Sequence, residues 1–109
     1  MVTTREQALE IAAKVRAGLE KLYGPRLRGV YLYGSAARDE LREDSDIDIA
    51  VVLDEVTDSF AEHGRVSDLR SDLSLEYSTL VSFLIVSDEE LRTGRFAVDQ
   101  FIKEEGIPV

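Results

Sequence analysis

The sequence contains no cysteine and no tryptophan, and its single histidine is His63. The absence of cysteine excludes a disulfide framework, a thiolate zinc site, an iron–sulfur cluster and a cysteine nucleophile. No partner motif surrounds His63, so we interpret it as a loop or helix-start residue and not as a catalytic base. Thiol chemistry is therefore excluded, and histidine catalysis is disfavoured.

Long apolar runs and positive charge are also scarce. No stretch approaches the roughly 20 apolar residues that span a bilayer, and residues 1–6 lack the apolar segment of a secretory signal. We therefore expect a cytoplasmic protein. The 13 basic and 22 acidic residues give a net charge of −9, which should repel nucleic acid and anionic membranes. A polyanion would be tolerated only where a bound metal or a local arginine cluster reverses the sign.

What is present fits one small globular α/β or α+β domain over residues 1–109. The chain is 44% apolar and 32% charged, which is typical of a folded protein. Apolar residues at helical spacing predict two long helices and a short last one. The apolar positions are Ala8, Ala12, Val15, Leu19 and Leu22 in the first helix; Val66, Leu69, Leu73 and Tyr77 in the second; and Val98, Phe101 and Ile102 in the last. Strands are predicted over 27–33, 46–53 and 80–86, and residues 54–64 are expected to form a connection. This alternation predicts a small mixed sheet of about three strands with helices packed on it.

Several boundaries carry their own local signals. Capping boxes are predicted at Thr3 or Thr4, and a helix start at Ser87. Gly24 and Pro25 should end the first long helix, because proline disfavours helical geometry in the residue before it. Gly106 can end the last helix.

The most informative stretch joins a Gly-Ser turn to two alternating acids. Gly34 and Ser35 follow the first strand, and ten residues separate Ser35 from Asp46. Because strand side chains alternate, Asp46 and Asp48 should share one face, with Cα atoms about 6.5–7 Å apart. Two such carboxylates suit Mg²⁺, which is typically held together with substrate phosphates. The turn could grip a phosphate, and Arg38 could reach the same phosphate.

This pattern resembles the nucleotidyltransferase superfamily that includes DNA polymerase β. The G-S-x-x-R and S-D-I-D-I forms are most similar to its minimal nucleotidyltransferases (MNT), which are encoded beside HEPN proteins. The resemblance implies Mg²⁺ or Mn²⁺ bound by Asp46 and Asp48 as catalytic residues. It also implies that ATP or another NTP contacts the residues Gly34, Ser35, Arg38 and Ser45. The implied activity is transfer of NMP to a hydroxyl of a HEPN-family partner, as the antitoxin of a toxin–antitoxin pair. The resemblance further implies that the chain forms a homo- or hetero-oligomer.

The chain departs from that family at two positions. Asp39 stands where minimal members often have glycine. The family also places a third acid on the later strand, where this sequence has Ser82 within residues 80–86. Glu76 is the nearest acid in sequence and is a candidate third metal ligand, although it lies at the end of the preceding predicted helix.

Three alternatives remain open from the sequence. Asp46 and Asp48 could be solvated acids at the start of a strand, with no functional role. The chain could also be a nucleotide-binding module that neutralises its partner by complex formation and catalyses no transfer, or a nucleotide sensor. Tyr31 and Tyr33 are interpreted as sheet-packing residues and not as base-stacking ones.

Overall fold

Helices and strands follow one another along the chain in the order that the sequence predicts, with one further short strand added at the end. The computed structural model describes residues 2–109. Its elements are α1 (Arg5–Tyr23), η1 (Gly24–Arg26), β1 (Leu27–Tyr33), β2 (Ile47–Leu53), α2 (Ser59–Tyr77), β3 (Val81–Ser87), α3 (Asp88–Thr93), α4 (Ala97–Glu105) and β4 (Ile107–Pro108). No helix in this described part of the chain is long and apolar enough to cross a membrane.

The strands form one mixed sheet in the order β3-β2-β1-β4. β1 runs antiparallel to both β2 and β4, whereas β2 and β3 are parallel. The mixed sheet with packed helices is confirmed, but it has four strands and not three. β4 comprises only Ile107 and Pro108, which is too short for any periodicity to reveal.

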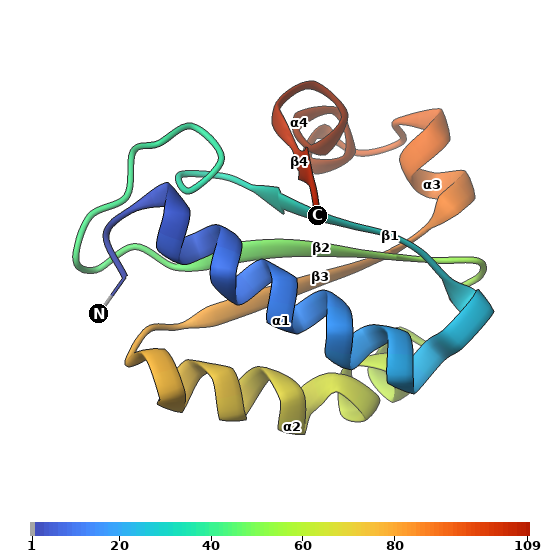
Figure 1. Cartoon of the computed structure of the whole chain (residues 1–109). Helices are drawn as coiled ribbons and strands as arrows, with labels where there is room; N and C mark the ends of the chain where they lie inside the picture. The colour runs from blue at the N-terminus through green and yellow to red at the C-terminus, as the bar shows by residue number, and fades with distance from the viewer. Residues whose placement is uncertain (1) are drawn as a thin grey trace.

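Helices cover both faces of the sheet (Figure 1). α1 and α2 lie on one face, where Ile47, Ile49 and Val51 join the main core. α3 and α4 lie on the other face over a smaller cluster that includes Ala50, Val52 and Ile102. β2 is apolar on both faces after Asp48, which explains why its sequence changes from alternating to continuously apolar.

The ends of α1 combine confirmed and wrong predictions. Thr4 forms the capping box, because its side chain accepts from the backbone of Gln7 while the Gln7 side chain accepts from the backbone of Thr4. The helix ends at Gly24. Leu22 was predicted to complete the apolar stripe but is 50% exposed, and Tyr23 is buried in its place. The hydroxyl of the buried Tyr23 donates to Glu62 on α2 at 3.1 Å, which satisfies this polar group inside the core.

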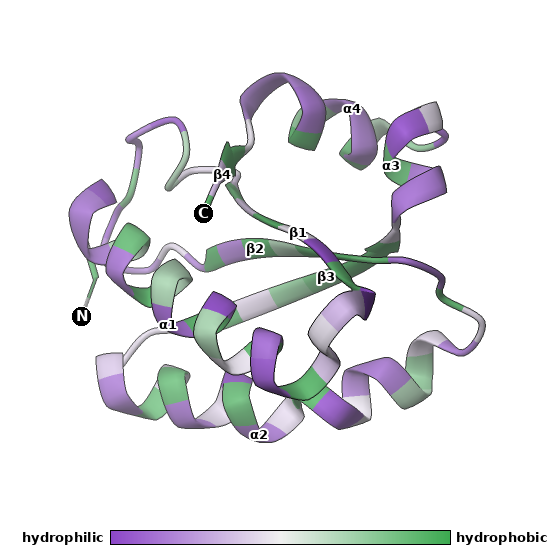
Figure 2. Cartoon of the chain, turned by 45° about the vertical axis from the view of Figure 1, so that its right-hand side comes forward, coloured by the Kyte–Doolittle hydropathy of each residue, from purple (hydrophilic) through white to green (hydrophobic). Residues whose placement is uncertain are grey.

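α2 begins earlier than predicted, at Ser59 and not near Gly64. Asp58 caps it by accepting from the backbone N–H of Ala61 at 3.1 Å. The first turn carries no apolar stripe, since Phe60 is 89% exposed, so periodicity becomes visible only at Val66. In α4 the predicted apolar face is also partly wrong, because Phe101 is 52% exposed. Figure 2 colours each residue by hydropathy, from purple for hydrophilic to green for hydrophobic, and shows both kinds of residue along α2 and α4.

Candidate active site

The Gly-Ser turn and the second strand meet at the end of β1. Tyr33 and Asp48 are register partners in the antiparallel β1–β2 pair. Gly34 follows with a φ of +72°, and a Cβ built on it would lie 2.6 Å from Oδ2 of Asp48. Such a distance is far inside van der Waals contact, and positive φ disfavours other residues. Glycine at position 34 therefore lets the turn backbone lie directly against the Asp48 carboxylate.

Asp48 and Asp46 form a pair of neighbouring acids at the start of β2. Asp48 is half-buried, whereas Asp46 lies exposed just before the strand. Burial raises the pKa of Asp48, and the charge of Asp46 raises it further, while Arg38 acts in the opposite direction. Two adjacent carboxylates in partial burial favour a cation between them. Their hard oxygens fit Mg²⁺ or Mn²⁺, so the residues present suit the divalent metal that the family implies.

Tyr33 contributes its aromatic ring to the same neighbourhood. It packs against the smaller core cluster, which confirms its interpretation, and that of Tyr31, as sheet-packing residues. Burial raises the pKa of the Tyr33 hydroxyl to about 12, and the negative charge of Asp48 contributes in the same direction. The Tyr33 hydroxyl therefore stays protonated and neutral near Asp48.

Ser82 lies beside Asp48 on the next strand. The parallel β2–β3 register pairs Asp48 directly with Ser82, so both side chains point to the same face of the sheet. Among residues 2–109, no three acidic or histidine side chains gather closely enough to hold a metal. The position next to Asp48 on β3 thus carries a hydroxyl and no carboxylate.

Glu76 is not brought to this pair of acids. Its carboxylate accepts from the ammonium group of Lys14 at 2.6 Å, between α2 and α1. This hydrogen bond lowers the pKa of Glu76. The two helices cover the face that holds Ile47 and Ile49, whereas Asp48 points to the opposite face.

The loop after Gly34 folds as successive turns and not as a helix start. The backbone N–H of Arg38 donates to the carbonyl of Gly34 at 3.2 Å, and that of Glu40 donates to the carbonyl of Ser35 at 2.8 Å. Buried Ala37 anchors the loop, because its carbonyl accepts from the guanidinium of Arg5 at 2.7 Å.

The position where the family often has glycine falls in these turns. Asp39 has a φ of +59°. Aspartate tolerates the left-handed conformation better than most residues do. This backbone geometry explains why glycine suits the position and why aspartate can replace it.

A cavity of about 580 Å³ opens beside these turns, and its lining residues include Ser35, Arg38 and Ser45. Three of the four predicted nucleotide contacts therefore share one cavity, and the fourth, Gly34, adjoins it. Ser45 also has a structural contact, because its hydroxyl accepts from the backbone N–H of Arg42 at 3.0 Å. The cavity places a guanidinium and hydroxyls next to the acid pair, as a bound phosphate chain would require.

Arg38 is held by a residue that sequence reasoning missed. Its guanidinium pairs with Glu40 at 3.3 Å and with Glu105, at the end of α4, at 3.1 Å. Glu105 lies 67 positions further along the chain, and no local pattern links the two. These contacts raise the pKa of Arg38. An incoming phosphate would therefore compete with two carboxylates for this arginine.

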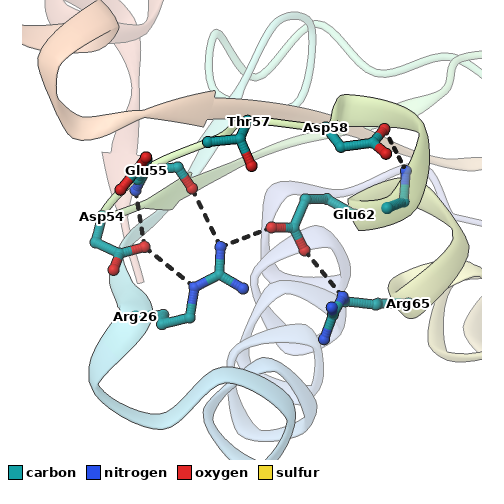
Figure 3. A pocket seen from close by; sticks show the side chains of 8 residues that line it. Arg26, Asp54, Glu55, Thr57, Asp58, Glu62 and Arg65 are labelled. Carbon is teal, nitrogen blue, oxygen red and sulfur yellow. Dashed lines mark hydrogen bonds and ion pairs between the residues drawn. The ribbon is translucent and has the colours of Figure 1, made fainter.

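A second polar pocket, of about 340 Å³, lies at the opposite end of β2 (Figure 3). Buried Glu62 accepts from Arg26 at 2.6 Å and pairs with Arg65 at 3.4 Å. Asp54 also pairs with Arg26, at 3.2 Å. Both arginines thus have carboxylate partners within the chain, and none of the predicted nucleotide contacts lines this pocket, so we interpret it as a structural ion-pair network.

Comparison with known proteins agrees with this geometry. Residues 18–103 match the family model described as Polymerase beta, Nucleotidyltransferase. The match covers most of the chain, so this protein belongs to the polymerase β-type nucleotidyltransferase family.

Individual relatives are similar over most of this chain. "Putative protein adenylyltransferase MJ0604" of Methanocaldococcus jannaschii is 34% identical over 71 residues, and the alignment spans 65% of this chain and 65% of that relative's length. A toxin–antitoxin crystal structure with AMP-PNP contains a chain that is 25% identical, with a TM-score of 0.65, covering 89% of this chain and 70% of that one. A chain in the structure of a tri-AMPylated Shewanella oneidensis HEPN toxin in complex with MNT antitoxin shares the fold. It is 21% identical, with a TM-score of 0.60, and the match covers 93% of this chain and 70% of that chain.

Proposed function

We propose that this chain is a metal-dependent nucleotidyltransferase that moves the AMP group of ATP to a hydroxyl of a HEPN-family partner. In this role it would be the antitoxin of a toxin–antitoxin pair. The observation that carries the proposal is the contact of the Gly34 backbone with the Asp48 carboxylate, beside Asp46 and the cavity of Ser35 and Arg38. Similarity to "Putative protein adenylyltransferase MJ0604", and to toxin–antitoxin chains solved with AMP-PNP or with a tri-AMPylated toxin, supports an adenine nucleotide and a protein acceptor.

The proposed reaction is an in-line displacement at the α-phosphorus. The acceptor oxygen bonds to the α-phosphorus, the bond from that phosphorus to the bridging oxygen breaks, pyrophosphate leaves, and the acceptor proton passes to solvent. Ser35 and Arg38 would bind the phosphates, and the turn at Gly34 would position them. Asp46 and Asp48 would hold Mg²⁺ or Mn²⁺, which neutralises phosphate charge when bound.

The protein acceptor is preferred to a nucleic acid template because of charge. The chain has a net charge of −9, and such a chain repels an extended polyanion. A protein acceptor needs only a local contact near the site.

One observation favours a second candidate function, a module that binds nucleotide and partner without turnover. Asp48 has Ser82 as its neighbour on β3, and no third carboxylate joins the two acids among residues 2–109. If Ser82 stands where relatives place their third acid, activation of the acceptor hydroxyl suffers more than nucleotide binding does. Neutralisation of the partner would then rest on the complex itself.

The test is incubation of the chain with labelled ATP, Mg²⁺ and the HEPN partner. We expect slow labelling of the partner that is lost with a chelator and with Asp46→Asn. The variant Ser82→Asp should accelerate labelling, because it adds a carboxylate next to Asp48. The control variant Ser82→Asn introduces a side chain of nearly the same size as aspartate but without the charge, so it should not accelerate labelling.

The two candidate functions predict different outcomes for Ser82→Asp. On the binding-module hypothesis, the variant adds a charge beside Asp48 at a partly buried position and only destabilises the fold. A folded Ser82→Asp protein that binds Mg²⁺ and ATP but labels no partner would contradict the transferase proposal and favour the module.

A further inference from the structure

A groove of about 610 Å³ lies between the end of α2 and the start of β3. Its lining residues include Arg70, Leu75, Leu80 and Ser82, and we call it the β3 groove. Ser74 joins its two walls, because its hydroxyl accepts from the backbone N–H of Val81 at 3.1 Å. The groove thus has a fixed floor where the helix meets the outermost strand.

Along the sheet, the β3 groove and the phosphate-binding turn lie on opposite sides of Asp48. The α2 wall of the groove covers the face opposite to the Asp48 carboxylate, whereas Ser82 lines the groove at the edge strand β3 and shares the face of Asp48. The sheet order β3-β2-β1 puts Ser82 on one side of Asp48 and the turn at Gly34 on the other. In phosphoryl transfer the attacking and leaving oxygens lie roughly in line, on opposite sides of the phosphorus. If the turn binds the phosphates of the nucleotide, the acceptor hydroxyl can therefore approach the phosphorus from the β3 side.

The chemistry of the β3 groove is unusual for this acidic chain. Leu75 is 79% exposed and Leu80 is 58% exposed, so two large apolar side chains of the groove face solvent. Arg70 is the charged side chain that lines the β3 groove. The guanidinium of Arg70 has no hydrogen-bond or ion-pair partner within residues 2–109, in contrast to those of Arg26 and Arg38. The groove therefore presents apolar surface and one uncompensated positive charge.

We infer that the β3 groove docks the acceptor protein of the proposed reaction. The occupant is a segment of that protein with an apolar side chain against Leu75 and Leu80 and an acidic side chain facing Arg70. Its hydroxyl reaches Asp48 around the edge strand β3 at Ser82. This inference rests on the proposed function for its choice of occupant, while the surface itself can be tested without turnover.

The experiment measures binding of the HEPN acceptor to chains that also carry Asp46→Asn, so that no transfer complicates the titration. The test variants are the double change Leu75→Ser and Leu80→Ser, and the single change Arg70→Glu. Phe60→Ser is the control for the first, because Phe60 is exposed on the same helix outside the groove. Arg28→Glu is the control for the second, because Arg28 is exposed on β1 outside the groove.

We expect both groove changes to weaken binding at least tenfold and the controls to change it less than twofold. In chains that retain Asp46, the same groove changes should raise KM for the acceptor and leave kcat unaltered. Calorimetry with Mg²⁺ and ATP, carried out on the groove variants that retain Asp46, checks that the groove changes leave the nucleotide site intact.

Three results separate this inference from the proposed function. Unchanged acceptor affinity in the double leucine variant would overturn the docking assignment, even if transfer occurs. Absence of acceptor binding by the parent chain would also overturn it. Weakened binding in the groove variants without transfer by any chain would support the β3 groove and refute the proposed reaction.

Discussion

Replacement of Gly34 by alanine should disturb the candidate site through one identifiable collision. Position 34 has a φ of +72°, and an added Cβ would lie 2.6 Å from Oδ2 of Asp48. Alanine in the left-handed region costs about 1–2 kcal/mol. Displacement of the Asp48 side chain from its preferred rotamer adds about 0.5–1.5 kcal/mol. The free energy of unfolding should therefore fall by about 1.5–3.5 kcal/mol.

The two contributions can be separated by a double-mutant cycle with Asp48→Ala. That change removes the colliding oxygen, so Gly34→Ala should then cost only the backbone strain, and the coupling should be about 0.5–1.5 kcal/mol. A chain of 109 residues loses roughly 4 °C of Tm per kcal/mol, so the coupling should appear as about 2–6 °C in thermal unfolding.

Gly64→Ala provides the matched control for a glycine-to-alanine change. Gly64 lies in α2, and an added Cβ would meet no atom within 4 Å. This variant should be more stable than the parent by about 0.5–1 kcal/mol, because glycine is unfavourable inside a helix. Additive effects of Gly34→Ala and Asp48→Ala in the cycle would refute the proposed close approach of the turn to the carboxylate.

Three further predictions concern charge. Burial and the charge of Asp46 raise the pKa of Asp48, so ionisation of Asp48 opposes folding as the pH rises. Without metal, Asp48→Asn should therefore raise Tm at about pH 7 but leave it unchanged below about pH 3. The opposite trend would contradict the assignment. Glu62→Gln should lower the free energy of unfolding by about 1–2 kcal/mol in urea titrations, since Arg26 and Arg65 lose their buried partner but reach solvent; an unchanged midpoint would refute this. Glu105→Gln should increase ATP affinity in calorimetry by freeing Arg38, and weaker binding would show that Glu105 positions the arginine productively.

Parts of the site followed from the sequence because they depend on neighbours along the chain. Alternation in β2 is a property of any strand, so Ile47 and Ile49 could be placed in the core and Asp48 on the opposite face. The polarity and spacing of the Gly-Ser turn are equally local. The early start of α2 at Ser59 was missed for the same reason, because its exposed first turn carries no apolar period.

Contacts between distant segments could not be predicted from local patterns. The sequence offered Glu76 as a candidate third metal ligand because it is the nearest acid along the chain, yet the packing of α1 on α2 gives it Lys14 as a partner. Glu105 reaches Arg38 only because α4 packs over β1 on the other face of the sheet. The two-residue strand β4 exists only through its pairing with Tyr31 and Leu32.

The sequence by itself determined the fold class, the two neighbouring acids and the glycine turn, because side-chain periodicity and turn chemistry are encoded within a few residues. The tertiary structure decided which groups meet: Gly34 against Asp48, Ser82 beside Asp48, and an open groove at the outer strand. Strand order and register depend on how the two cores fill on both faces of β2. That condition is shared by residues far apart along the chain, so only the packed molecule satisfies it.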